Sequence, residues 1–532
     1  MSSTSTHVPR RAGAREWAGL AVLALPMLLL ALDNSVLFLA APQVGADLDP
    51  SAVQLLWIMD VYSFMVAGFM ITMGTLGDRI GRRRLLMLGA AAFAAASVLA
   101  AFSGSAEMLI IARLLLGVAG ATLGPSALAL VGTMFTDPRQ RGLAFGIFTA
   151  CFMGGAALGP VAGGVLLESY WWGSVFLLGV PVMALLLITG PVILPEYRDT
   201  AAGRVDLASV ALSLATIMPV IYGLKEIAED PGRLTPYLVL AAGLAFGAWF
   251  VRRQLTLADP LLDLGLFKGR AFTATLAILL VTMIMQGGLY LFASQYLQLV
   301  EGMTPLKAGL WLVAPAVAMG VGSVTAPLIA RRFRPAHILG LGFTVAAAGL
   351  VTMAVADGLA GLLTGLVIAF LGTAPVGVFA FDLIVGSAPL ERAGAASAIA
   401  QTSGELGIAL GIALLGSLGG AVYRLRMDVP AGEDSLSAAA EAAGHLSAPA
   451  AGTLLDAAHA AFGDALMAVS FACAAAMAVL AVVSVVVLRS IAPATGEPAE
   501  EAAPGTPGAD GPGTRTPGAD GPGAGAEPVV RA

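Results

Sequence analysis

Charged residues are scarce in this chain of 532 residues. Asp, Glu, Lys and Arg together make up 12% of it, whereas hydrophobic residues make up 58%. Soluble domains carry about 25% charged residues, so the composition excludes a soluble globular protein. The formal net charge of −6 says little by itself, because the charges of a membrane protein are sorted by side of the membrane. The sequence therefore predicts an all-α polytopic membrane protein.

Residues that support covalent, metal or phosphate chemistry are also few. The two cysteines, Cys151 and Cys473, both lie in apolar runs and indicate no disulfide framework. The four histidines show no metal-ligand spacing, and the chain has no G-x-x-x-x-G-K-[ST] loop for ATP. We therefore expect no enzymatic activity, no metal site and no cofactor, with a proton gradient as the energy source.

Long apolar runs, by contrast, are abundant. We predict fourteen transmembrane spans of about 18–30 residues, each long enough to cross a hydrocarbon core of ~30 Å. Their expected limits are 17–41, 55–76, 85–102, 108–132, 142–167, 174–194, 207–224, 234–251, 271–300, 308–330, 336–355, 359–385, 395–421 and 464–489. With both termini in the cytoplasm, most arginines fall on the inner side of the cell membrane, as the positive-inside rule requires. The outer loops then hold Lys225, Arg233, Lys307, Arg424 and Arg426.

A faint internal repeat groups these spans. The sequence TLGDRIGRRRLL at 75–86 resembles PLIARRFRPAHIL at 327–339, although any inner loop can collect arginines. Repeated halves are typical of secondary transporters. We expect a cytoplasmic segment over 1–16, a six-helix half over 17–194, a linker with two inserted central helices over 195–270, and a second six-helix half over 271–489.

Two segments lie outside these spans. Residues 423–463 form a long extracellular loop, in which Asp434 and Ser435 are candidate helix caps. A break at Ser447 to Pro449 suggests two short helices there. The tail 490–532 repeats T-P-G-A-D-G-P-G and has little to bury, so we expect a disordered cytoplasmic tail that transport does not need.

Glycine and proline form a specific pattern in the fifth span. Residues 146–164 read G-x₈-G-x₃-G-P-x-x-G-G and include Gly155, Gly159, Pro160 and Gly163. Such spacing lets two helices approach backbone to backbone, and the alternative is ordinary small-residue packing. The pattern resembles the antiporter motif on the fifth helix of the major facilitator superfamily.

The loop after the second span also resembles that superfamily. Residues 74–86 read GTLGDRIGRRRLL, and the match to the signature loop comprises Gly74, Leu76, Asp78, Arg79, Gly81, Arg82 and Arg83. The resemblance implies that Asp78, Arg79, Gly81 and Arg82 take part in conformational gating. Contacts that exist in one conformation, such as arginines paired across the two halves, bias an inward–outward equilibrium. The alternative is a basic loop that only sets topology.

The count of fourteen spans resembles the drug:proton antiporter branch of this superfamily, and within it the multidrug pumps that expel quaternary ammonium compounds and dyes. Four segments support this: LDNSVLFLAAP at 32–42, QLLWIMDVYSF at 54–64, SQYLQLVEGMTPLKAG at 294–309, and FDLIVGSAPLERAGAASAIAQTSGELG at 381–407. The resemblance covers about residues 17–489 and implies the major facilitator fold.

Five ionisable residues fall inside predicted spans: Asp33, Asp60, Arg113, Asp382 and Glu405. Each costs about 2.5–3.5 kcal/mol at mid-bilayer, so each should face a cavity or a partner. We assign proton coupling to Asp33 with Arg113. The alternative is a permanent salt bridge between these two residues.

The remaining acids are assigned to the substrate. Asp60 and Glu405 match acidic positions of the resembled pumps, although Asp60 could instead reach the outer interface. Trp57, at i−3 from Asp60, adds an aromatic face for a lipophilic cation. The pumps also have an acid where Gln401 stands, which puts binding of divalent cations in doubt.

Three further residues are less specific. Asp382 either lines the cavity or caps a helix end. Gln286 and Tyr290 recur with Ser294 and Gln298 at every fourth position, so they share a face that lines the cavity or packs on a neighbour.

These residues predict proton-coupled efflux of lipophilic, cationic drugs or toxic compounds by alternating access, and hence drug resistance. The expected partners are the substrate, protons and the lipid bilayer, with no nucleic acid, and the expected unit is a monomer. The main alternative is a dedicated exporter of an endogenous metabolite or antibiotic. An importer, or a receptor that does not transport, fits the motifs less well.

Overall fold

The computed structural model describes residues 11–488 except for 136, 197, 199–205, 230–231, 258–259, 261, 263, 331, 357, 387–392 and 428–434. These residues form helices and their connections, with no strand among them, as the all-α prediction requires. The predicted segment 1–16 is described only from residue 11. The predicted tail 490–532 lies outside the described residues.

The first half of the chain supplies helices that follow the first six predicted spans. They are α1 (Ala14–Leu48), α2 (Ala52–Ile80), α3 (Arg82–Ala101), α4 (Ala106–Met134), α5 (Pro138–Ser169), α6 (Ser174–Leu177) and α7 (Gly179–Ile193). Polar caps set their starts. The Ser51 hydroxyl accepts from the Gln54 N–H before α2, and the Ser105 hydroxyl accepts from the Met108 N–H before α4.

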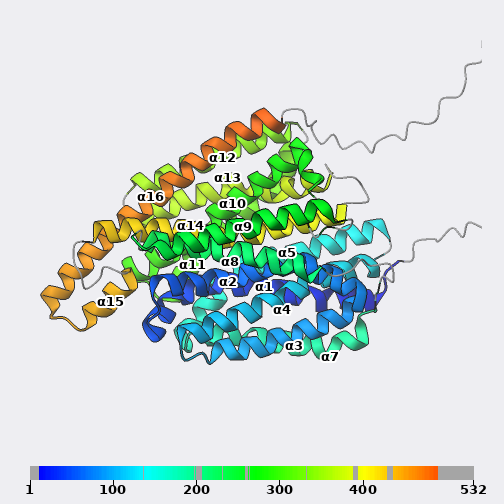
Figure 1. Cartoon of the computed structure of the whole chain (residues 1–532), viewed down its shortest axis with the longest axis horizontal. Coiled ribbons are helices and arrows are strands. Elements are labelled where there is room, and N and C mark those ends of the chain that lie inside the picture. The colour runs from blue at the N-terminus through cyan, green and yellow to red at the C-terminus, as the bar shows by residue number, and fades with distance from the viewer. Residues whose placement is uncertain are drawn as a thin grey trace, which may run out of the picture. The chain divides into compact units, whose positions relative to one another are not determined.

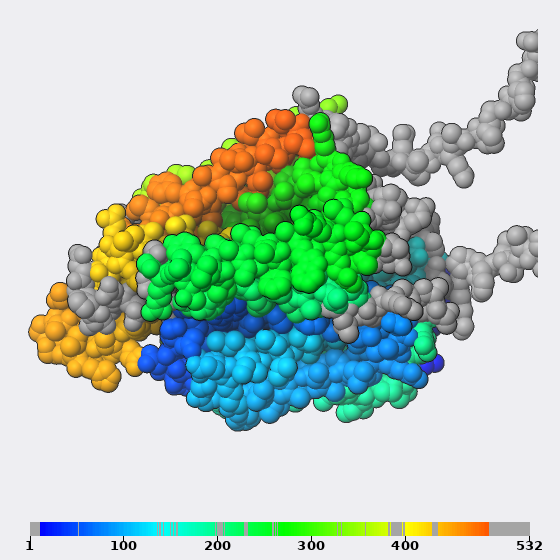
Figure 2. Space-filling view, in the orientation of Figure 1, coloured from blue at the N-terminus to red at the C-terminus, as the bar shows by residue number. Residues whose placement is uncertain are grey.

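The inserted pair comprises α8 (Leu207–Glu229) and α9 (Leu234–Thr256), followed by a short turn, η1 (Leu266–Lys268). α8 packs along α9 and also contacts α2 and α14, one helix from each half. Figure 1 shows both helices in green between the blue and the yellow-to-orange parts of the chain. Figure 2 shows that this pair covers the junction of the two halves on the face in view.

The second half repeats the arrangement. Its elements are α10 (Arg270–Gln295), a π-helical turn η2 (Tyr296–Val300), α11 (Pro305–Ala330), α12 (Pro335–Val355), α13 (Gly358–Gly386), α14 (Ala393–Arg426), α15 (Leu436–Gly444) and α16 (Ala448–Leu488). The halves meet where α2 packs on α14 and α5 packs on α11.

Thirteen helices in the described part of the chain are long and apolar enough to cross a membrane. The predicted count of fourteen is not reached by this criterion. Two shorter apolar helical stretches, Leu143–Phe152 and Leu158–Ser169, were found within α5 among the described residues. α5 itself is 32 residues long, from Pro138 to Ser169.

The segment 423–463, predicted as a long extracellular loop, differs from the expectation. α15 begins where predicted, since the Ser435 hydroxyl accepts from the Ala438 N–H, whereas Asp434 lies outside the described residues. The second short helix is wrong as a separate element. Its residues form the start of α16, which runs without a break for 41 residues. Pro449 does not interrupt α16, because proline in a first turn removes an N–H that has no helical partner.

Candidate functional site

The first buried ion pair joins α1 to α4. Asp33 Oδ2 lies 2.9 Å from Arg113 Nη1, and the two side chains are 8% and 0% exposed. Arg113 also donates to the Ile58 carbonyl of α2 and lies over the Tyr62 ring, with 4.6 Å from its Cζ to the ring centroid. Asp33 and Arg113 therefore meet as the sequence predicted, and Arg113 links the pair to α2.

The second buried ion pair joins α2 to α8. Asp60 Oδ2 lies 2.7 Å from Lys225 Nζ, and both side chains are fully buried. The Lys225 ammonium also lies 4.2 Å from the centroid of the Trp57 ring. The carboxylate and the aromatic face predicted for a substrate cation are thus both present, with a cation of the chain itself between them.

This arrangement corrects two expectations. Lys225 does not lie in an outer loop, because α8 continues to Glu229 and buries it. Asp60 does not reach the outer interface, since it is buried beside Lys225. The span predicted at 207–224 ended five residues before the end of α8, because a lysine reads as a helix-flanking charge. The sequence did indicate that Asp60 of α2 needs a buried partner, but it did not identify Lys225 as that partner.

Glu405 completes the cluster from α14. Its Oε2 is buried and has no hydrogen-bond partner among the described residues, and no cationic side chain of that part of the chain forms an ion pair with it. Glu405 lies on α14, which packs on α2, and Tyr62 of α2 contacts Arg113. The helices that carry Asp60 and Glu405 are therefore in contact. Of the three carboxylates, Glu405 alone lacks a counter-ion in the described structure.

A small apolar cluster packs beside these charges. Phe64 of α2, Ile221 of α8, and Ala409 and Ala413 of α14 are all buried against one another. Trp57 packs against the same cluster. The part of the site around Asp60 is therefore built from one helix of each half plus the inserted α8, and Asp33 and Arg113 add α1 and α4.

The polar stripe of α10 packs on neighbouring helices. The Tyr290 ring lies 5.7 Å from both the Phe38 ring of α1 and the Phe370 ring of α13. Gln286 donates to the Met319 sulfur of α11 at 3.8 Å. Ser294 donates to the Phe38 carbonyl of α1 at 2.6 Å, a bond between the two halves.

The signature loop forms its contacts inside the first half. Arg82 pairs with Asp78 at 2.6 Å and donates to the Pro125 carbonyl of α4. Arg83 and Arg84 lie near Glu196, which follows α7, and Arg79 is exposed. Pairing of these arginines across the halves, as predicted, is thus not seen among the described contacts.

Gly81 explains why this loop requires glycine. It joins α2 to α3 with a φ of 112°, which side-chain-bearing residues rarely adopt. A Cβ there would also meet the Glu196 carboxylate at 2.5 Å.

The glycines of α5 lie against α1, as the spacing predicted. A Cβ added at Gly155 would collide with the Leu28 carbonyl, and those at Gly159 and Gly163 with the side chains of Ser35 and Val36. A Cβ added at Gly309 of α11 would collide with the Pro160 carbonyl of α5. α5 therefore also packs closely on α11 of the other half.

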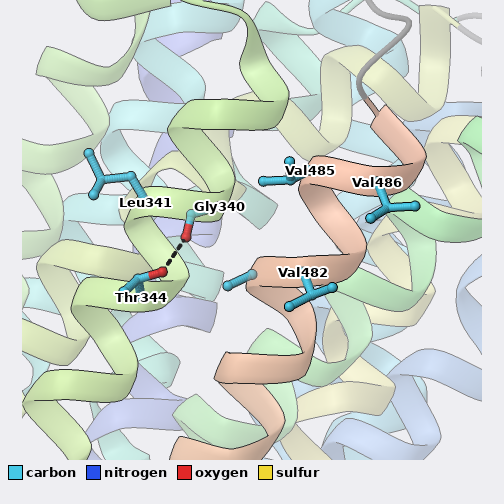
Figure 3. A pocket seen from close by; sticks show the side chains of 7 residues that line it. Gly340, Leu341, Thr344, Val482, Val485 and Val486 are labelled. Atoms are coloured by element: carbon cyan, nitrogen blue, oxygen red, sulfur yellow. Dashed lines mark hydrogen bonds between the residues drawn. The ribbon is translucent and has the colours of Figure 1, made fainter.

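Three further features concern possible sites away from the carboxylates. The Asp382 side chain lies outside the described residues. A groove of about 450 Å³ between α12 and α16 is lined by Gly340, Leu341, Thr344, Ala481, Val482, Val485 and Val486 (Figure 3). It contains no charged side chain and is separate from the carboxylate cluster. No group of three metal-ligating side chains occurs among the described residues.

The family model for the Major Facilitator Superfamily matches residues 23–412. The chain belongs to the major facilitator superfamily. It is therefore a multi-span membrane transporter of a family whose members carry small molecules.

Individual relatives agree with this assignment. The chain is 43% identical to the multidrug efflux pump LfrA of Mycolicibacterium smegmatis over 495 residues, which is 91% of this chain and 97% of LfrA. It is 34% identical to the methyl viologen resistance protein SmvA of Salmonella typhimurium, over 79% of this chain and 85% of SmvA. A bacterial homologue of the human lysosomal transporter Spinster shares the fold, with a TM-score of 0.68, 16% identity, and coverage of 90% of this chain and 98% of the other.

Proposed function

We propose that this chain exports lipophilic cations from the cytoplasm in exchange for protons, without a cofactor. The observation that carries the proposal is the group of three membrane-buried carboxylates, Asp33, Asp60 and Glu405, at the junction of the halves. Ionisable groups at this depth mark ion and substrate pathways. The names of the relatives support the export of toxic compounds, because one is a multidrug efflux pump and the other is a methyl viologen resistance protein.

Glu405 is proposed to attract the substrate charge into the site, in addition to Asp60. It lacks a counter-ion among the described residues, so a substrate cation gains its full attraction. The rings of Trp57 and Tyr290 offer aromatic surface for the lipophilic part of the substrate. A neutral compound would gain only the contact with the aromatic rings and not the attraction to Glu405.

Asp33 is the proposed proton carrier. Protonation removes its charge, so the ion pair with Arg113 exists in only one protonation state. Arg113 also holds the Ile58 carbonyl and the Tyr62 ring of α2. Loss or gain of a proton at Asp33 therefore alters the restraint on the helix that carries Asp60.

The conformation described fits an inward-facing carrier with both termini in the cytoplasm of the cell. The contacts between halves gather toward the end of the bundle where α1 leads into α2: Ser294 with Phe38, Gly309 with Pro160, and Gly416 with Leu56. In the proposed orientation this is the outer end. Alternating access requires these contacts to open. The site is complete within one chain, so we propose a monomer as the working unit.

The test is dye transport in everted membrane vesicles energised by a proton gradient. Ethidium, a monovalent lipophilic cation, should accumulate in the vesicles and stop accumulating when an uncoupler is added. The matched control is the double variant Asp33→Asn/Glu405→Gln, which should behave like vesicles without the protein. Transport that ignores the uncoupler would contradict proton exchange, and absence of ethidium transport by the unaltered chain would contradict the substrate class.

A further inference from the structure

The ammonium group of Lys225 occupies a place suited to an organic cation. It lies 2.7 Å from a carboxylate oxygen of Asp60 and 4.2 Å from the centroid of the Trp57 ring. A carboxylate beside an aromatic face is the combination that recognises quaternary ammonium and other lipophilic cations. Lys225 therefore satisfies the same two groups that a cationic substrate would use.

We propose that Lys225 is a tethered competitor of the substrate: its ammonium fills the cation position formed by Asp60 and Trp57, and a cationic substrate binds there by displacing it. This inference rests on the proposed export of cations. It makes Lys225 a specificity-determining residue, since a substrate must bind Asp60 and Trp57 more favourably than Lys225 does. Weakly held cations are then rejected, while neutral compounds do not compete with Lys225.

The position of Lys225 on α8 lets the displaced side chain reach the membrane interface. Lys225 lies four residues before Glu229, where α8 ends, and at 1.5 Å per residue this is about 6 Å of helix. A lysine has a flexible four-carbon stem and can extend its ammonium toward the membrane interface. The ammonium can thus leave Asp60 without being stranded in the apolar interior.

The contacts of α8 connect this exchange to the transport cycle. α8 packs on α2 of the first half and α14 of the second, through Ile221 against Phe64, Ala409 and Ala413. Relative movement of the halves must therefore change the surroundings of α8. The inserted pair then contributes a residue to the substrate site, in addition to any role as a spacer.

The test compares ethidium binding to the purified full chain in detergent, measured by fluorescence, between Lys225→Met and the unaltered protein. Loss of a competing contact should tighten ethidium binding by about tenfold, the effect of about 1.4 kcal/mol. A neutral transported compound should bind with unchanged affinity. The control variant is Arg253→Met, which breaks another ion pair of the same helix pair, Arg253 with Asp206 at 3.0 Å, away from the carboxylates.

A second variant decides the question if Lys225→Met does not fold. Lys225→Arg keeps the charge and binds a carboxylate through two N–H groups, so it should weaken ethidium binding several-fold and leave the neutral compound unaffected. Unchanged ethidium affinity in the variants that fold would overturn the inference and leave Lys225 a structural counter-ion. Failure of the proposed function is distinguishable, because it would appear as absent ethidium transport in the unaltered chain.

Discussion

Asp33 and Asp60 lie on successive helices, yet their counter-ions come from different parts of the molecule. Arg113 belongs to α4 of the same half as Asp33, whereas Lys225 belongs to the inserted α8. A pair within one half moves with that half. A pair between α2 and α8 breaks if α8 moves relative to α2 during the transport cycle, and persists if the two helices move together. The first pair is therefore suited to protonation and the second to exchange with a substrate.

At this scale we predict that Asp33→Asn both destabilises the protein and uncouples it. The change leaves Arg113 buried without its anionic partner, which costs about 3–5 kcal/mol in comparable buried pairs. The midpoint of thermal unfolding in detergent should fall, and uncoupler-sensitive efflux should be lost. Asp33→Glu, which retains an acid, is the control. Coupling at the level of the unaltered chain in Asp33→Asn would rule out the assigned role.

Glu405→Gln should separate charged from neutral substrates. The amide keeps the shape of the side chain but removes the charge that attracts a cation. We expect the apparent affinity for ethidium to fall about tenfold, equivalent to ~1.4 kcal/mol, with little change for a neutral dye. Concentration-dependent transport assays measure both. Equal losses for the two dyes would indicate a folding defect rather than recognition.

The acids of the site were predictable from the sequence, and one of their partners was not. A charge inside an apolar run is visible without a structure, which is how Asp33, Asp60 and Arg113 were found. Lys225 was missed because it lies four residues before the end of α8, where a lysine normally marks the membrane boundary. Only the three-dimensional approach of α8 to α2 shows that its charge points inward.

At the scale of elements, the glycines of α5 allow a matched comparison. Gly155→Ala places a methyl group against the Leu28 carbonyl of α1, whereas Gly154→Ala has no described atom within 4 Å of the new carbon. Overpacking of this kind costs about 1–3 kcal/mol. Gly155→Ala should lower both the thermal midpoint and ethidium efflux, and Gly154→Ala should leave them near those of the unaltered chain. Equal effects of the two variants would contradict close packing at Gly155.

The inserted pair has a pH-dependent anchor at the start of α8. Burial raises the pKa of the Asp206 carboxyl, but hydrogen bonds from Ser209 and Arg253 outweigh it and hold the pKa below its usual value. A group with a lowered folded-state pKa stabilises the fold above its unfolded pKa of about 3.9 and loses this contribution as the pH falls.

The pH dependence of unfolding tests this anchor. The difference in thermal midpoint between the unaltered chain and Asp206→Asn should be constant from about pH 7 to pH 5 and shrink below about pH 4. Thermal unfolding in detergent at a series of pH values measures it. A difference that grows with acidity would have the wrong sign.

Element boundaries were predictable where a polar cap or a glycine marks them. Ser435 at the start of α15 and the loop at Gly81 are examples. The continuity of α16 was not predicted: a separate short helix was expected before the span at 464–489, because the alanine-rich stretch is too weakly apolar to read as membrane, whereas one helix runs from Ala448 to Leu488. Alanine has high helix propensity in any solvent, so the helix continues beyond the apolar run.

At the scale of the whole molecule, alternating access predicts that joining the halves at their contact end stops transport. Leu56 of α2 lies against Gly416 of α14, where an added Cβ would be 2.6 Å from the leucine Cδ2. In a chain without Cys151 and Cys473, oxidation of Leu56→Cys/Gly416→Cys should abolish ethidium efflux, and a reductant should restore it.

The control crosslink joins helices that need not separate. Thr216 of α8 lies 2.9 Å, through its Cγ2, from an added Cβ at Gly247 of α9. Oxidised Thr216→Cys/Gly247→Cys should transport normally. Normal efflux in the first crosslinked protein would show that this end of the bundle does not open.

The two halves and the inserted pair could be inferred from the sequence because hydropathy and loop charge repeat with the chain. The packing of α8 on both halves could not. Apolar periodicity identifies a membrane helix but does not say which neighbours it has, since lipid and protein surroundings are equally apolar.

The length of α16 has a practical consequence. Its 41 residues extend about 60 Å at 1.5 Å per residue, about twice a hydrocarbon core of ~30 Å. In the proposed orientation its first part, with α15 beside it, stands outside the cell as a rigid helical hairpin. An antibody fragment could bind this hairpin without crossing the membrane. Such a fragment would serve as a marker for imaging or as an inhibitor.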